Sequence, residues 1–150
     1  MEVSIFKTTP DDVDNVAEVF DLYRVFYAQK SDFDLARRFL LERIISEESI
    51  VFHALDRTSS TTAGLAQIYP SFSSIAASRI WILNDLYVRP EYRGQGVAKK
   101  LIHTVHAHAE ETKAVKVVLS TAHSNHSAQA LYESLGYQPD LQFKTYAYKL

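Results

Sequence analysis

Cysteine is absent from this 150-residue sequence, and glycine and proline are scarce, with four residues of each. The lack of cysteine excludes disulfide bonds, thiolate metal sites and a cysteine nucleophile, and it favours a reducing compartment. No apolar run approaches the ~18 residues that a membrane-spanning helix needs. The N-terminal segment is acidic within a few residues and has no apolar core of signal-peptide length. We therefore expect a cytoplasmic protein that does not act at a membrane.

The charge balance narrows the class of partner. A formal net charge of −2 argues against a nucleic-acid binder, which usually carries a clear basic excess. Hydrophobic residues make up 47% of the chain and charged residues 23%, as in soluble globular proteins. The sequence shows no internal repeat and no linker, so we expect one domain over residues 1–150 with a single core.

Apolar periodicity predicts an α/β fold with a mixed central β-sheet and about four flanking helices. Thr9 and Pro10 are typical of a helix start. The run 78–88 is apolar on both faces except at Asn84 and Asp85, which predicts a central strand. In chain order we expect a strand over 3–6, helices over 8–29 and 32–48, strands over 49–56, 62–72 and 78–88, a helix beginning at 97, a strand over 114–122, a helix over 125–136 and a strand over 143–150.

Two of the four glycines, Gly94 and Gly96, lie between the strand over 78–88 and the next helix. Backbone N–H groups in such a turn, with the dipole of the helix start, favour a bound anion such as phosphate. Arg93, Lys99 and Lys100 add positive charge nearby. A tight turn that binds nothing explains the glycines equally well, and the sequence matches neither common nucleotide-binding fingerprint.

Asn125 and Tyr132 are seven residues apart, which puts both on one side of a helix. A right-handed crossover makes the strand over 114–122 the neighbour of the strand over 78–88, so this helix and the glycine turn follow adjacent strands. By themselves, Asn125 could be a helix N-cap and Tyr132 a core aromatic residue.

The segments NDLYVRPEYRGQGVAKKLI and VVLSTAHSNHSAQALYESLGY together resemble the GNAT superfamily of N-acetyltransferases. The acyl-CoA signature of that family is Gln or Arg, two residues, Gly, one residue, then Gly or Ala. Arg93, Gly96 and Ala98 match it. Within the superfamily, the sequence of these two segments is close to that of the spermidine/spermine and histone/polyamine acetyltransferases.

The resemblance implies acetyl-CoA as co-substrate and no metal. Backbone groups of Leu86, Tyr87 and Val88 would pair with the pantetheine arm, and Asn125 would contact it as well. The pyrophosphate would lie on the turn formed by Arg93, Gly94, Gln95, Gly96, Val97 and Ala98, with Lys99 close by.

The implied reaction is direct attack of a primary amine on the acetyl thioester in a ternary complex. Such chemistry needs no nucleophilic side chain, so the lack of cysteine does not oppose it. Main-chain N–H groups would stabilise the oxyanion. We expect Tyr132 to protonate the leaving thiolate and Asp85 to assist deprotonation of the amine, although Asp85 could be structural.

The resemblance implies a primary amine as the acceptor, on a small molecule, an amino acid or a lysine side chain. The family places an acceptor cleft beside Tyr27, Tyr69, Ser71, Phe72 and Asn84. Polyamine acetyltransferases carry an acidic residue where this chain has Asn84, which weakens the case for a polycationic acceptor. Core packing is the alternative for each aromatic residue.

Five histidines crowd the second half of the chain, at 103, 106, 108, 123 and 126. His103 and His106 lack an evident third ligand, so we expect solvated surface histidines and no metal site. Exposed aromatic residues in the predicted edge strand over 143–150 favour a homodimer.

Two other functions remain open on the sequence alone. A non-catalytic acyl-CoA sensor could use the same fold, since a fold does not prove turnover. A metabolite-binding domain without a CoA site is the second, and the turn from Arg93 to Ala98 argues against it.

Overall fold

Five strands form one sheet in the order β1-β2-β3-β4-β5 in the computed structural model, which describes residues 1–150. The first four strands pair antiparallel, and β4 pairs with β5 in parallel, so the sheet is mixed. This confirms that the strand over 78–88 is central. The strands are β1 Val3–Lys7, β2 Ile50–Asp56, β3 Thr61–Ser73, β4 Ser78–Val88 and β5 Val117–Val118.

Four α-helices accompany the sheet, as expected: α1 Val13–Phe26, α2 Phe33–Ile45, α3 Val97–Glu111 and α4 His126–Ser134. Short 3-10 turns, Pro10–Asp12 and Pro90–Tyr92, precede α1 and the glycine turn. By their backbone contacts, Met1–Leu119 form one compact unit, which holds the sheet and α1 to α3, and Ser120–Leu150 form a second, which holds α4.

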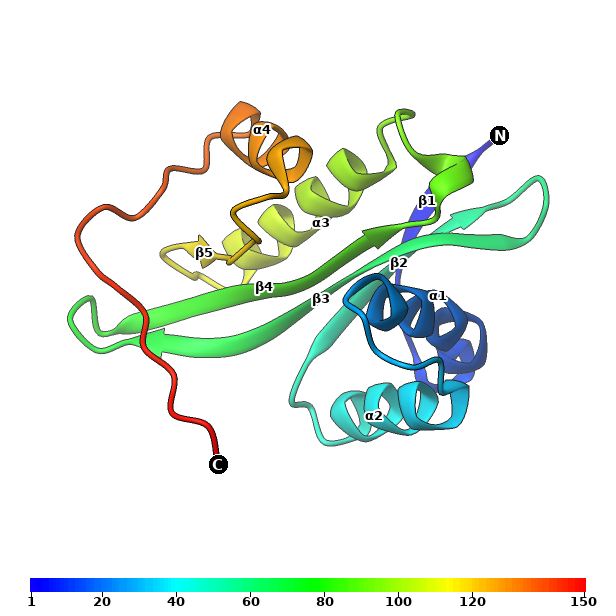
Figure 1. Cartoon of the computed structure of the whole chain (residues 1–150), viewed down its shortest axis with the longest axis horizontal. Coiled ribbons are helices and arrows are strands. Elements are labelled where there is room, and N and C mark those ends of the chain that lie inside the picture. The colour runs from blue at the N-terminus through cyan, green and yellow to red at the C-terminus, as the bar shows by residue number, and fades with distance from the viewer. The chain divides into compact units, whose positions relative to one another are not determined.

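Two helical layers bury the sheet of the first unit. Helices α1 and α2 cover one face and α3 covers the other (Figure 1). The α1 stripe of Val13, Val16 and Phe20 packs with Leu40 of α2 and Leu65 of β3. On α3 the predicted apolar stripe is buried, at Val97, Leu101, Ile102, Val105 and Ala109.

A β-bulge at Asn84 decides which way the middle of β4 faces. Ile68 pairs with Leu83, but the β3 residue before it, Gln67, pairs with Asp85, so Asn84 is an extra residue on β4. Without it, Asp85 would share the face of Leu83. The bulge instead puts Asp85 opposite Gln67, on the sheet face that α1 and α2 cover.

The pairing of β4 with β5 is short. It covers only Trp81 with Val117 and Ile82 with Val118, whereas β4 runs on to Val88. Beyond Ile82, β3 is therefore the only strand that pairs with β4. The other edge of β4 leads from the bulge to the glycine turn.

Two strand predictions were wrong, because one strand is much shorter than expected and the other is absent. The strand over 114–122 is formed only at Val117–Val118. The C-terminal strand over 143–150 is not formed. Its residues include exposed Phe143, Tyr146 and Tyr148, and the segment finds no strand partner within the chain. An apolar pattern favours a strand but does not supply the neighbour whose hydrogen bonds complete it.

Candidate active site

The segment before the glycine turn is anchored to the sheet. The Arg89 N–H donates to Ala63 O at 2.8 Å, and Arg89 Nε donates to Thr62 O at 2.7 Å. The Tyr92 hydroxyl donates to Asp56 Oδ2 at 2.9 Å. Burial alone would raise the pKa of Asp56, but the bonds from Tyr92 and from neighbouring groups outweigh it and lower the pKa to about 2. These hydrogen bonds hold the backbone in place just before the glycine turn begins.

Both glycines of the turn have left-handed backbone conformations, with φ of 72° at Gly94 and 82° at Gly96. A Cβ atom built on either glycine would meet no atom within 4 Å. Gly96 is the N-cap of α3, so the first N–H groups of that helix have no partner inside it. The turn thus combines open space with backbone donors, the arrangement that an anion needs.

The cations beside the turn are not equivalent. Arg93 Nε donates to Val88 O at 2.8 Å, and its guanidinium carbon lies 5.2 Å from the centre of the Tyr87 ring. Lys100 Nζ donates to Val3 O at 3.2 Å, so its charge is directed at β1 rather than at the turn, contrary to our expectation. Lys99 is exposed.

Asp85 is a buried carboxyl group held by two amides. Gln67 Nε2 donates to Asp85 Oδ2 at 2.6 Å, and Asn84 Nδ2 donates to Asp85 Oδ1 at 3.1 Å. Burial raises the pKa of Asp85 above its ordinary value, while the bonds from Gln67, Tyr23 and Asn84 oppose that rise. A carboxylate that binds a proton more readily than usual is suited to act as a base.

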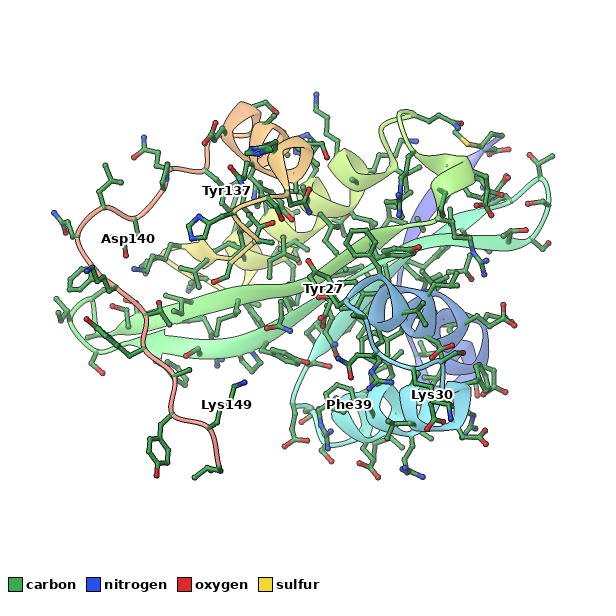
Figure 2. The ribbon with its side chains drawn as sticks, in the orientation of Figure 1. Tyr27, Lys30, Phe39, Tyr137, Asp140 and Lys149 are labelled. Atoms are coloured by element: carbon green, nitrogen blue, oxygen red, sulfur yellow. The ribbon has the colours of Figure 1, made fainter.

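Aromatic rings gather next to this carboxyl group. The Tyr23 hydroxyl donates to Asn84 O at 3.3 Å, and the Tyr23 ring centre lies 5.1 Å from that of Tyr27 and 6.2 Å from that of Tyr87. Phe26 contacts both Tyr27 and Tyr87. Tyr27 lies just beyond the end of α1 and is 46% exposed, so part of its ring is open to a ligand (Figure 2). We call Tyr23, Phe26, Tyr27 and Tyr87 the aromatic cluster.

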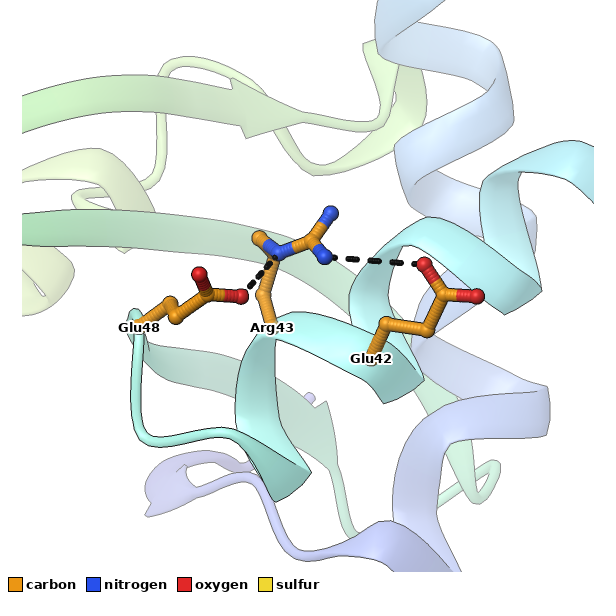
Figure 3. A network of polar contacts seen from close by, with 3 residues as sticks. All are labelled: Glu42, Arg43 and Glu48. Atoms are coloured by element: carbon orange, nitrogen blue, oxygen red, sulfur yellow. Dashed lines mark hydrogen bonds and ion pairs between the residues drawn. The ribbon is translucent and has the colours of Figure 1, made fainter.

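Tyr69 is affected by the opposite charges of Asp85 and Arg43. Burial raises the pKa of Tyr69 to about 12, helped by the Asp85 carboxylate and opposed by Arg43. Arg43, on α2, is bound by Glu48 at 2.8 Å and by Glu42 at 3.5 Å (Figure 3), and its guanidinium lies 4.9 Å from the centre of the Phe39 ring.

The predicted acceptor residues do not all come together. By strand alternation Ser71 shares the sheet face of Tyr69 and Gln67, whereas Phe72 lies on the opposite face. Phe72 is 67% exposed and contacts the Arg79 guanidinium at 4.5 Å. The structure therefore separates Phe72 from Asp85, because the strand period sends neighbouring residues to opposite faces.

In the second unit, Asn125 is the N-cap of α4, and its Oδ1 accepts from the Ala128 N–H at 3.3 Å. This confirms the capping role. Tyr132 lies on the same helix, and its ring centre is 5.7 Å from that of Tyr137. Burial, with a smaller effect from Tyr132, raises the pKa of Tyr137 to about 12.

One histidine was misjudged. His108 is not a solvated surface residue, because its ring packs 5.0 Å from the Trp81 ring and 5.7 Å from the Phe52 ring. Burial lowers the pKa of His108. No three or more His, Asp or Glu side chains gather in an arrangement that could hold a metal ion.

Sequence reasoning missed three residues that act on Asp85 or on Tyr69: Gln67 and Tyr23 on Asp85, and Arg43 on Tyr69. Gln67 had a visible signal, because it is the only polar side chain in the apolar run AGLAQIYP apart from the tyrosine that follows. Tyr23 and Arg43 had none, since each fits an ordinary amphipathic helix.

Comparison with known proteins settles the family. The model of the acetyltransferase (GNAT) family matches residues 16–137. The chain belongs to the GNAT family of acetyltransferases. It is an acyltransferase enzyme of a family that uses acetyl-CoA as co-substrate. None of its helices has the length and apolar character to span a bilayer.

Three relatives of this acetyltransferase illustrate the match. It is 36% identical over 144 residues to the uncharacterized N-acetyltransferase YhfO of Bacillus subtilis, covering 96% of this chain and 95% of YhfO. It is 34% identical over 87 residues to the D-amino-acid N-acetyltransferase HPA3 of Saccharomyces cerevisiae, covering 58% of this chain and 54% of HPA3. A crystal structure of a probable acetyltransferase superposes with a TM-score of 0.92 at 39% identity, covering 98% of this chain and 97% of that one.

Proposed function

We propose that this acetyltransferase moves the acetyl group of acetyl-CoA to a primary amine by direct attack in a ternary complex. The observation that carries the proposal is the bulge at Asn84. It turns the Asp85 carboxyl group toward the aromatic cluster, on a strand that leads directly to the glycine turn. An amine-activating base and a site for the co-substrate phosphates are then joined by one short stretch of chain.

The co-substrate lies along that stretch in this proposal. Open space and backbone donors at Gly94 and Gly96 support binding of the pyrophosphate between Arg93 and Ala98, with the exposed Lys99 as a counter-charge. The edge of β4 without a strand partner supports pairing of the pantetheine arm with Leu86, Tyr87 and Val88. On α4, Asn125 contacts the same arm through its side-chain amide, which as an N-cap uses only its oxygen.

The proposed chemistry divides two proton transfers between two residues. Asp85 takes a proton from the acceptor ammonium, directly or through water, and the freed lone pair attacks the thioester carbonyl carbon. A main-chain N–H group of β4 stabilises the oxyanion, the bond from carbon to sulfur breaks, and Tyr132 donates its proton to the thiolate. The second proton of the attacking nitrogen leaves through water as the amide forms and restores the Tyr132 hydroxyl, and Asp85 then releases its own proton to solvent. The raised pKa of Asp85 supports its role, because a stronger base competes better for an ammonium proton.

The acceptor in this proposal is a primary amine that reaches Asp85 past Tyr27, with Tyr69, Ser71 and Asn84 lining its path. An aromatic face attracts an ammonium group, which supports a cationic amine as the form that binds. The name of HPA3, a D-amino-acid N-acetyltransferase, supports an amino acid as one candidate. The polyamine and histone branch is less well supported, because Asn84 contributes an amide to Asp85 instead of a second carboxylate.

We propose a homodimer in the cytoplasm, with residues 1–150 of each chain as its catalytic domain. The support for dimerisation is the exposed apolar C-terminal segment, where Leu141, Phe143, Tyr146, Tyr148 and Leu150 are all at least 74% exposed. An apolar segment of this kind usually finds a partner surface.

The decisive experiment measures release of free CoA from acetyl-CoA with a panel of amines, amino acids and lysine peptides. Turnover with at least one amine, lost in Asp85→Asn, is the expected result. Tight binding of acetyl-CoA without turnover on any acceptor would contradict the proposal and favour the non-catalytic sensor.

A further inference from the structure

The side chain of Gln67 is the least expected feature of the sheet. It is fully buried in the middle of β3, where Leu65 and Ile68 are equally inaccessible. Its Nε2 donates to Asp85 at 2.6 Å, but its Oε1 is buried and accepts no hydrogen bond. A buried acceptor without a donor costs free energy that an apolar side chain of similar size avoids. Packing alone therefore does not explain a glutamine here.

We propose that Gln67 is a positioning residue that holds the Asp85 carboxylate for proton transfer and then accepts a hydrogen bond from protonated Asp85. The inference rests on the proposed role of Asp85 as the base. While Asp85 is ionised, Nε2 of Gln67 donates to Oδ2, as observed. When a proton passes from the acceptor ammonium to Oδ2, half a turn of the Gln67 amide exchanges its nitrogen and oxygen. Oε1 then accepts from the new O–H.

The residue type fits this task. An amide carries both a donor and an acceptor and has no charge, so it serves both forms of the carboxyl group. A lysine would hold Asp85 ionised, and a glutamate would oppose its ionisation. Asn84 supplies the second fixed donor, at 3.1 Å from Oδ1, so the carboxylate plane is held at both oxygens.

Other titratable groups face the same carboxyl group and must be held constant in any test. Tyr23 approaches from α1, and Tyr69 from β3, with Arg43 of α2 acting on Tyr69. None of these is changed by a substitution at position 67, so a shift in the titration of Asp85 reports on the amide.

The first measurement needs no turnover. NMR titration with ¹³C-labelled aspartate, assigned through Asp85→Asn, gives the pKa of Asp85. The ¹⁵N shift of the Gln67 side-chain amide in the wild-type protein should follow the same titration. In Gln67→Met the pKa of Asp85 should rise by about one unit, because the bond lost from the carboxylate is stronger than the bond lost from the acid. A ¹⁵N shift of the Gln67 side-chain amide that does not change as Asp85 titrates would overturn the inference. This result comes from the wild-type protein, so it holds even if Gln67→Met does not fold.

The second measurement is the pH profile of kcat/KM, with Ile68→Val as the matched control. Ile68 is the next residue on β3, is equally buried and faces the other side of the sheet. Gln67→Met should move the acid limb upward by about one pH unit, while Ile68→Val lowers the melting temperature and leaves the limb in place. If the acid limb of the wild-type enzyme reflects the pKa of Asp85 and Gln67→Met leaves that limb in place, the role of Gln67 is refuted while the proposed function stands. Absence of turnover in all variants, with the NMR coupling intact, would instead contradict the proposed function.

Discussion

A single methyl group at Gly96 tests the proposed phosphate site. Gly96 has φ of 82°, and a Cβ atom there meets nothing within 4 Å, so Gly96→Ala creates no clash inside the protein. The alanine does pay for its left-handed backbone, by about 1–2 kcal/mol. For a chain of this length, that corresponds to a melting temperature about 2–8 °C lower.

The loss of co-substrate affinity has a different cause. The new methyl group occupies space that the pyrophosphate requires, so at least one hydrogen bond from a backbone N–H to a charged oxygen is lost. Such a bond contributes about 1.5–3 kcal/mol, which weakens binding of CoA roughly ten- to a hundredfold. Calorimetry with CoA measures this loss directly.

Gly136→Ala is the matched control. Gly136, which follows α4, has φ of 95° and equally open surroundings, so the same substitution imposes the same kind of backbone strain. It should lower the melting temperature by a similar amount and leave CoA affinity unchanged. If folded Gly96→Ala binds CoA as tightly as Gly136→Ala does, the turn does not hold the pyrophosphate and this assignment is wrong.

Four further predictions address the other proposed roles. Tyr132→Phe should lower kcat by ~10²–10⁴-fold with little change in the melting temperature; steady-state kinetics within about twofold of wild type would exclude Tyr132 as the acid. The folded-state pKa of Asp85 is raised, so its carboxyl group favours folding at low pH and opposes folding as the pH rises through that pKa. Asp85→Asn removes this pH dependence. Thermal melts should therefore show Asp85→Asn more stable relative to wild type at pH 7 than at pH 4. Asp56 changes stability with pH in the opposite direction, because its pKa falls from 3.8 to about 2 on folding and its contribution to stability is lost as the pH falls. Tyr92→Phe should therefore melt below wild type above pH 4, with the difference disappearing as pH falls to about 2, and a difference that is constant with pH would refute the link to Asp56. Light scattering should give the mass of a homodimer, and removal of residues 141–150 should give a monomer; a monomeric full-length chain at micromolar concentration would exclude the dimer.

The glycine turn could be predicted from sequence because its cause is local. Only glycine adopts positive φ without strain, so Gly94 and Gly96 between a strand and a helix indicate a special backbone wherever they lie in space. The apolar stripe of α3 is equally local, and both predictions were confirmed.

The centre of the site could not be predicted in the same way. The bulge at Asn84 adds one residue within a strand that is apolar on both faces except at Asn84 and Asp85, so the run has no regular alternation that the bulge would visibly break. Without the bulge, Asp85 would face α3, and neither Gln67 nor Tyr23 would be its neighbour. These contacts depend on register between strands and on helix placement, which a single sequence does not encode locally. The missing C-terminal strand has the same origin, since a strand depends on its neighbour.

The central claim is that an amine receives the acetyl group directly. Mass spectrometry of a mixture of enzyme, acetyl-CoA and an accepted amine, sampled through the reaction, tests it. We predict acetylated amine and free CoA in equal amounts, with the mass of the protein unchanged at every time point. A transient acetylated protein, or bound CoA without any acetylated amine, would contradict this account.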